Sequence, residues 1–167
     1  MRKIFLFSFM FLGVLSCKNK NMETTITKND ILVFDTSKWI KKAVVNAKAS
    51  SIISSWSEYS AFDTSLDVLY ESENLEDLAI GLEDLIEKQK LLLKSDYPEE
   101  YDVPQIKSRQ KVVLTFMLKL KADLEYRLPV EEAVLEMLRA NNAMRTQFNV
   151  EVNNPLDNSL IIEEEEN

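Results

Sequence analysis

Apolar residues recur at alternating spacings of three and four along residues 75–148. This spacing places side chains on one face of an α-helix, whereas a half-buried strand would show a period of two. The apolar positions form three series: Leu75, Leu78, Leu82, Leu85 and Leu92; Ile106, Val113, Met117, Leu120, Leu124 and Leu128; and Val130, Val134, Met137, Met144 and Phe148. The pattern predicts an all-α fold.

Helix start and stop signals separate the three series. Asn74 is a good N-cap, and Asp77 three residues later resembles a capping box. Pro98 ends that helix, while Pro104 and Pro129 suit the first turns of the next two, because proline lacks the backbone donor that a helix interior needs. The expected helices cover residues 74–94, 104–128 and 129–149.

A further helix is expected nearer the N-terminus. Asp35-Thr36-Ser37 offers N-cap residues, and Val45, Ile52, Trp56 and Tyr59 continue the helical spacing. The segment Ser60–Thr64 is a plausible break, so this helix either stops near Tyr59 or continues towards residue 70. Together, the four segments predict a small antiparallel helical bundle of about four helices over residues 35–149.

Composition excludes several classes of chemistry. The chain has only two glycines among 167 residues, Gly13 and Gly81, which disfavours phosphate-cradling loops and hairpin-rich β folds. It has no histidine, which removes Ser-His and Cys-His nucleophile systems and the Glu-x-x-His ligands of di-iron bundles. We therefore expect no enzyme, no metal and no cofactor.

The remaining ligand-like residues have simpler interpretations. Glu131, Glu132 and Glu136, and the acidic loop Glu99–Asp102, lie in polar stretches typical of a solvated surface. The methionines of the apolar series occupy positions where methionine fills a core, so a thioether copper site is disfavoured.

The N-terminus has the features of a secretory signal. Arg2 and Lys3 precede an uncharged stretch, Ile4–Leu15, of twelve residues. As a helix this stretch would span about 18 Å, which is short of a bilayer core of about 30 Å. The stretch ends in Val14-Leu15-Ser16-Cys17, which resembles the lipobox of bacterial lipoproteins in the relaxed form, ending in Ser-Cys, of the Bacteroidota. Val14 and Leu15 depart from the commonest pattern, which has Leu followed by Ala or Ser.

The resemblance covers residues 1–17 only and implies a processing route. Residues 1–16 would be a signal peptide, and Cys17 would be acylated and become the first residue of the mature chain, anchoring it to a membrane. Residues 17–34 would form the lipidated cysteine, a flexible tether and a lead-in, and residues 150–167 an acidic, disordered tail. Because Lys18 follows the cysteine rather than Asp, and no acidic cluster comes after it, the resemblance favours the outer membrane, facing the periplasm.

Two further constraints follow from this processing. Cys17 is the only cysteine, so the mature domain would contain no disulfide and would depend on packing. Processing would remove two of 20 basic residues and none of 28 acidic ones, so the net charge would change from −8 to −10. Such a charge opposes nucleic-acid binding.

Four residues are candidates for binding. Trp39 and Trp56 are potential ligand platforms or core anchors. Arg109 could pair with a carboxylate of this chain or of a partner, and Asn141 interrupts an apolar series where it could fix register or line a polar pocket. Two functional hypotheses remain open: an interaction module that binds another envelope protein, or a small-ligand carrier or sensor with a site between the helices.

Overall fold

The computed structural model describes residues 35–153, and within this range every regular element is helical, which confirms the predicted all-α class. The predicted signal peptide, Cys17, the tether and most of the acidic tail lie outside the described residues. The elements are η1 (Thr36–Lys38), α2 (Ala47–Ile53), α3 (Ser57–Tyr70), α4 (Leu75–Leu92), η2 (Glu99–Tyr101), α5 (Pro104–Glu125) and α6 (Glu131–Asn153).

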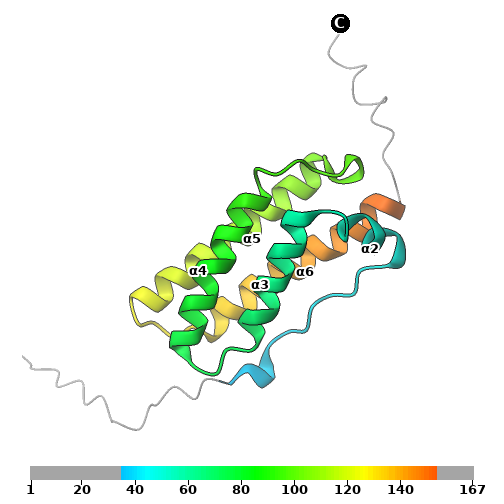
Figure 1. The fold of residues 1–167 in the computed structure, drawn as a ribbon. Helices are drawn as coiled ribbons and strands as arrows, with labels where there is room; N and C mark the ends of the chain where they lie inside the picture. Colours follow the sequence, from blue (N-terminus) through cyan, green and yellow to red (C-terminus); the bar gives the residue numbers. More distant parts are fainter. Residues whose placement is uncertain (1–34, 154–167) are drawn as a thin grey trace, which may run out of the picture. The chain divides into compact units, whose positions relative to one another are not determined.

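The four longest helices pack as successive neighbours along the chain: α3 against α4, α4 against α5, and α5 against α6 (Figure 1). Polar side-chain contacts also join neighbouring helices. The Ser65 hydroxyl of α3 donates to Asp84 of α4 at 2.6 Å, and the Lys121 ammonium of α5 lies 3.2 Å from Glu83 of α4. The short helix α2 and the turn η2 both pack on α6.

The core is built from the apolar series that the sequence spacing predicts. Within α6, Val134, Met137, Met144 and Phe148 are fully buried, and the corresponding residues of α4 and α5 are buried with few exceptions. Leu128 is an exception, with 49% of its surface exposed. It lies beyond the end of α5, where the helical spacing no longer decides which way a side chain points.

The prediction that a long helix starts at Asp35 is wrong. The Asp35 carboxylate accepts a hydrogen bond from the Ser37 amide, but it caps only the single turn η1. Residues 40–46, hereafter the strap, form no regular element, and α2 begins at Ala47 after Asn46, whose side chain accepts from the Ala49 amide at 2.8 Å. The strap stays non-helical because its peptide groups bond to side chains of α6, as described below.

The break between the first two helices comes earlier than the sequence indicated. Helix α2 ends at Ile53, and the hydroxyls of Ser54 and Ser55 donate to carbonyls three residues back, at 2.9 and 2.7 Å. Such local bonds compete with continued helix formation. Helix α3 then runs unbroken to Tyr70, so the predicted break at residues 60–64 is absent.

The ends of α5 and α6 also differ from expectation. Helix α5 stops at Glu125, because Arg127 adopts a left-handed backbone conformation with φ of 55°. The amide of Leu128 donates to the carbonyl of Asp123 at 2.8 Å, and that of Arg127 to Leu124 at 3.1 Å, which together form a Schellman motif. Helix α6 continues to Asn153, four residues beyond the predicted boundary.

Arg127 occupies a position that favours glycine, and this leads to a prediction. The substitution Arg127→Gly should raise the free energy of unfolding by about 0.5–1 kcal/mol, since it removes left-handed strain at some cost in chain entropy. Urea denaturation of the purified chain would measure the change. Arg127→Ala, which keeps the Cβ, should give no such gain, and equal stabilisation by both variants would contradict the explanation.

Candidate functional site

The strap is held by one face of α6. Asn142 makes two hydrogen bonds to it: its Oδ1 accepts from the Ala43 amide, and its Nδ2 donates to the Lys41 carbonyl, both at 2.8 Å. One turn further along α6, Arg145 Nε donates to the Ala43 carbonyl at 2.7 Å. These bonds satisfy backbone N–H and C=O groups of the strap, which has no internal secondary structure to pair them.

Asn149 repeats the same pairing two turns after Asn142. Its Oδ1 accepts from the Asn46 amide at 2.8 Å, and its Nδ2 donates to the Val44 carbonyl at 3.0 Å. Just beyond the strap, Lys48 Nζ of α2 donates to the Val152 carbonyl at 2.5 Å. The strap therefore runs parallel to α6, and side chains of the helix bind its backbone in order.

An ionic network joins the strap, α3 and α6. Arg145 Nη1 donates to Asp63 at 2.8 Å and to the Tyr59 hydroxyl at 2.9 Å. The Lys42 ammonium of the strap lies 3.1 Å from Asp63 and 2.7 Å from Asp67. Because only 11% of the Arg145 side chain is exposed, its charge would be poorly solvated without Asp63. The network therefore fixes the position of the strap between two helices.

The paired asparagines lead to a prediction about stability. Asn149→Ala should lower the free energy of unfolding by about 1–2 kcal/mol, since two hydrogen bonds are lost and two strap groups lose their partners. Urea denaturation measures the global effect, and hydrogen exchange should accelerate at the Asn46 amide. Thr146→Ala, at an exposed position of α6 whose hydroxyl bonds only within the helix, is the control. An effect no larger than that of the control would contradict the assigned role.

Trp56 is the centre of an aromatic cluster and is only 3% exposed. Its ring centroid lies 4.9–6.4 Å from those of Tyr59, Tyr97, Tyr101 and Phe148. The indole Nε1 donates to the Ser95 hydroxyl at 2.9 Å, which satisfies its polar group. Burial raises the pKa of the Tyr59 and Tyr101 hydroxyls, so both stay protonated. Trp56 therefore acts as a core anchor.

Trp39 lies at the other end of α3. It follows η1 and contacts Tyr70 edge to face, with ring centroids 5.8 Å apart. The Tyr70 hydroxyl donates to the Ile40 carbonyl of the strap at 2.6 Å, and burial raises the pKa of this hydroxyl to about 12. This contact fastens the first residue of the strap to the last turn of α3.

Three buried amide side chains lie in the core, Gln89 on α4, Gln110 on α5 and Asn141 on α6. Neither amide atom of Asn141, which is 1% exposed, has a hydrogen-bond partner among the described residues. Gln89 Nε2 of α4 donates to the Gln110 carbonyl of α5 at 2.9 Å, and Gln110 Oε1 accepts from the Tyr97 hydroxyl. Gln89 and Gln110 each interrupt an apolar series in the sequence, four residues after one apolar position and three before the next, and this spacing is the signal for their burial.

Replacing Asn141 is predicted to change the free energy of unfolding in the opposite direction to replacing Asn149. Asn141→Leu should raise the free energy of unfolding by about 1 kcal/mol, since an unpaired buried amide costs stability and leucine has a similar branched shape. The matched control is Asn149→Leu, which removes a bonded amide and should destabilise the protein. Chemical denaturation would compare the two, and destabilisation by both variants would show that Asn141 is paired or fixes packing.

The four residues proposed for binding do not converge. Trp39 and Trp56 lie at opposite ends of α3, Asn141 is inside the core, and Arg109 is exposed on α5. Arg109 forms no ion pair with any carboxylate of residues 35–153, so the intramolecular pair considered for it is not found there.

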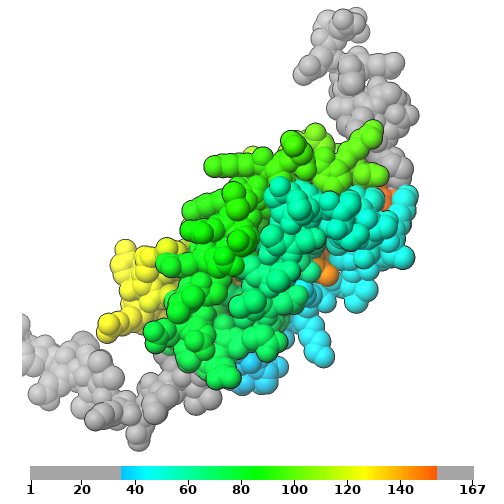
Figure 2. All heavy atoms as spheres, in the orientation of Figure 1, coloured from blue at the N-terminus to red at the C-terminus, as the bar shows by residue number. Residues whose placement is uncertain are grey.

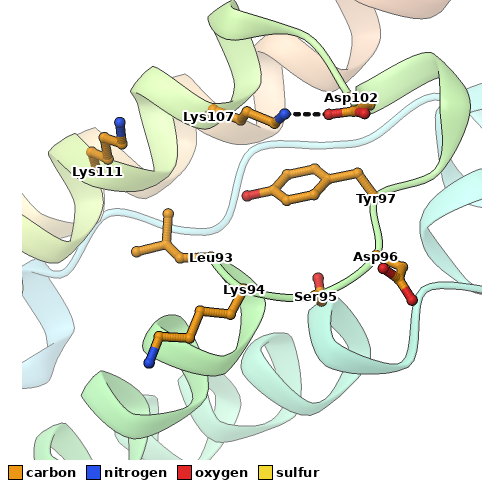
Figure 3. Close-up of a pocket in the computed structure, with 8 residues that line it drawn as sticks. All are labelled: Leu93, Lys94, Ser95, Asp96, Tyr97, Asp102, Lys107 and Lys111. Atoms are coloured by element: carbon orange, nitrogen blue, oxygen red, sulfur yellow. Dashed lines mark ion pairs between the residues drawn. The ribbon is translucent and has the colours of Figure 1, made fainter.

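A hollow of about 420 Å³ lies beside the connection from α4 to α5 (Figure 3). Its lining residues are Leu93, Lys94, Ser95, Asp96, Tyr97, Asp102, Lys107 and Lys111. Lys107 pairs with Asp102 and lies 5.1 Å from the centroid of the Tyr97 ring. The ammonium groups of Lys94 and Lys111 point in opposite directions in Figure 3. This hollow therefore does not gather its positive charges around one point, as an anion site would.

A second hollow, of about 440 Å³, lies between α3 and α4. We call it the acidic groove, because three carboxylates and no basic residue line it. Its lining residues are Ser65, Val68, Glu71, Ser72, Asp77, Ile80, Gly81 and Asp84. Val68 and Ile80 are 60% and 66% exposed, so the groove combines apolar side chains with an acidic border.

The acidic groove belongs to a strongly charged half of the domain. Residues 57–92, which contain α3 and α4, carry ten acidic and two basic residues, a net charge of −8. Residues 104–153, which contain α5 and α6, carry six acidic and eight basic residues, a net charge of +2. Figure 2 shows that α3 and α4 together form much of one face of the molecule. The negative charge of the domain is therefore concentrated on one pair of helices.

Within residues 35–153, no group of three or more histidine, cysteine, aspartate or glutamate residues is placed to hold a metal ion. None of the helices described here has the length and hydropathy needed to cross a membrane. No protein-family model matches the chain, and comparison with curated proteins and with solved structures finds no match.

Proposed function

We propose that this protein is a lipid-anchored, non-enzymatic interaction module of a bacterial cell envelope, attached to the outer membrane through Cys17 and facing the periplasm. In this proposal the helical domain is an antiparallel four-helix bundle that binds another envelope protein. The lipobox resemblance of residues 14–17 supports the anchor, and the lack of histidine supports the absence of enzymatic chemistry.

The observation that carries the proposal is the separation of charge between the two pairs of helices. The α3–α4 half has a net charge of −8, and the exposed Val68 and Ile80 lie within it. Charged surfaces of one sign steer oppositely charged partners, and exposed apolar side chains then provide area to bury on contact. The strap is compatible with the same function. Its hydrogen bonds to α6 fasten the N-terminal part of the described domain to the helices, so a pull on the anchor would reach the whole bundle.

The competing hypothesis was a small-ligand carrier or sensor with a site near Trp39, Trp56, Arg109 and Asn141. Neither of the two hollows described above is lined by any of these residues. The interaction module is therefore the function that the geometry supports better.

The proposed function predicts a partner that depends on the acidic helices. Affinity-tagged full-length protein should recover at least one envelope protein reproducibly after mild cross-linking and solubilisation, as measured by quantitative mass spectrometry. Recovery should fall about three- to tenfold in the triple variant Glu71→Gln, Glu76→Gln, Glu87→Gln, because attraction to a positive surface weakens with each lost charge.

The matched control removes three charges elsewhere, with Glu99→Gln, Glu125→Gln and Glu131→Gln, and should recover the partner normally.

The lipid anchor is tested by a separate variant. Cys17→Ser should release the protein from the membrane fraction. Failure to recover any reproducible partner with the wild-type protein would refute the proposed function.

A further inference from the structure

We propose that the acidic groove between α3 and α4 binds a basic amphipathic helix of the partner protein. This inference rests on the proposed function and adds to it the place and the chemistry of the contact. Three features of the groove support it: the small residues that line it, its exposed apolar residues and its acidic border.

Small residues are among those that line the groove. Ser65 on α3 and Gly81 on α4 line it, and the Ser65 hydroxyl is bonded to Asp84. A Cβ added at Gly81 would lie 3.4 Å from Leu69 Cδ1 and 3.7 Å from Leu69 Cα, so the two helices approach closely here. The hollow beside this close contact has room for larger side chains of a third element.

Exposed apolar residues lie on both α3 and α4, the helices that border the groove. Val68 of α3 is 60% exposed and Ile80 of α4 is 66% exposed. Leu91, which is 57% exposed, is eleven residues after Ile80, a separation of three helical turns that places both on one face of α4. These residues would lose contact with water under a partner element that runs along the groove.

The border of the groove selects the charge of the partner. Glu71, Asp77 and Asp84 line it, and the surrounding α3–α4 half carries the net charge of −8. Asp84 is already bonded to Ser65 and paired with Lys88, so Glu71 and the net negative charge of this half supply the main attraction for lysine or arginine side chains that flank an apolar stripe.

The backbone of the groove selects a helix rather than an extended peptide. The peptide groups along α3 and α4 are bonded within their own helices, so the groove offers no row of free backbone donors and acceptors. An extended ligand needs such a row, or side chains that replace it as on α6, while a helix satisfies its own backbone. The groove wall supplies carboxylates and apolar carbons, which suit the side chains of a basic amphipathic helix.

A photo-cross-linker at Ile80 tests the inference directly. Full-length protein carrying a photoreactive residue at position 80, or at position 118 of α5 as a control, would be irradiated with solubilised envelope and the linked peptides sequenced. Leu118 is 46% exposed and lies in the half with net charge +2, so it samples a different surface. We expect position 80 to link to one segment with a net positive charge and helical apolar spacing.

A second measurement uses the linked segment as a synthetic peptide. Its affinity for the full-length protein should fall about two- to fivefold with Glu71→Lys, because an attractive charge becomes repulsive, and about tenfold with Ile80→Ser, because apolar contact is lost while the charge stays the same. Glu125→Lys is the matched control, because it reverses a charge at the end of α5 as Glu71→Lys does at the end of α3. It should leave the affinity unchanged.

The outcomes separate this inference from the proposed function. If position 118 links to a partner and position 80 does not, or if position 80 links to an acidic or extended segment or to a second copy of this chain, the groove inference is overturned and the interaction module stands. If neither position links and the pull-down also recovers nothing, both proposals fail.

Discussion

Helix α6 must satisfy two different neighbours at once, and the remaining structure depends on this constraint. One face presents Met137, Met144 and Phe148 to the core, where they are fully buried. Another presents Asn142 and Asn149 to a segment that has no secondary structure of its own. The first face supplies the burial that a disulfide-free domain needs, and the second allows an extended segment to be part of the folded structure.

The sequence predicts those parts of the fold whose cause is local. Caps at Asn74 and proline at Pro104 mark the starts of α4 and α5 correctly, because each feature acts on the backbone within one turn. The strap was not predictable in this way. Asp35 offers a cap, yet the chain remains extended because its hydrogen-bond partners come from residues about a hundred positions away. Periodicity carries no information about such distant side chains.

The same distinction between local and distant causes applies to the residues of the candidate site. Asn141 and Trp56 could be recognised from their places in the apolar series, since burial follows from spacing, and both are buried. The acidic groove could not be recognised, although the sequence alone shows five acidic residues between positions 74 and 94. Its shape depends on how closely α3 approaches α4, and hence on Gly81 lying against Leu69. A sequence shows each of these residues but not their proximity.

The way in which the strap is bound also determines how freely its sequence can vary. Asn142, Asn149 and the Arg145 Nε contact its amides and carbonyls, which every amino acid except proline supplies in full. Val44, whose side chain is 84% exposed, is therefore open to exchange without loss of these bonds. Much of the information that specifies this part of the fold therefore resides in the helix, while Lys42 and Asn46 add side-chain contacts from the strap itself. Strap variants changed at exposed positions such as 44 would follow the same course along α6, provided that positions 43 and 46 keep their backbone N–H groups and Lys42 keeps its ion pairs with Asp63 and Asp67.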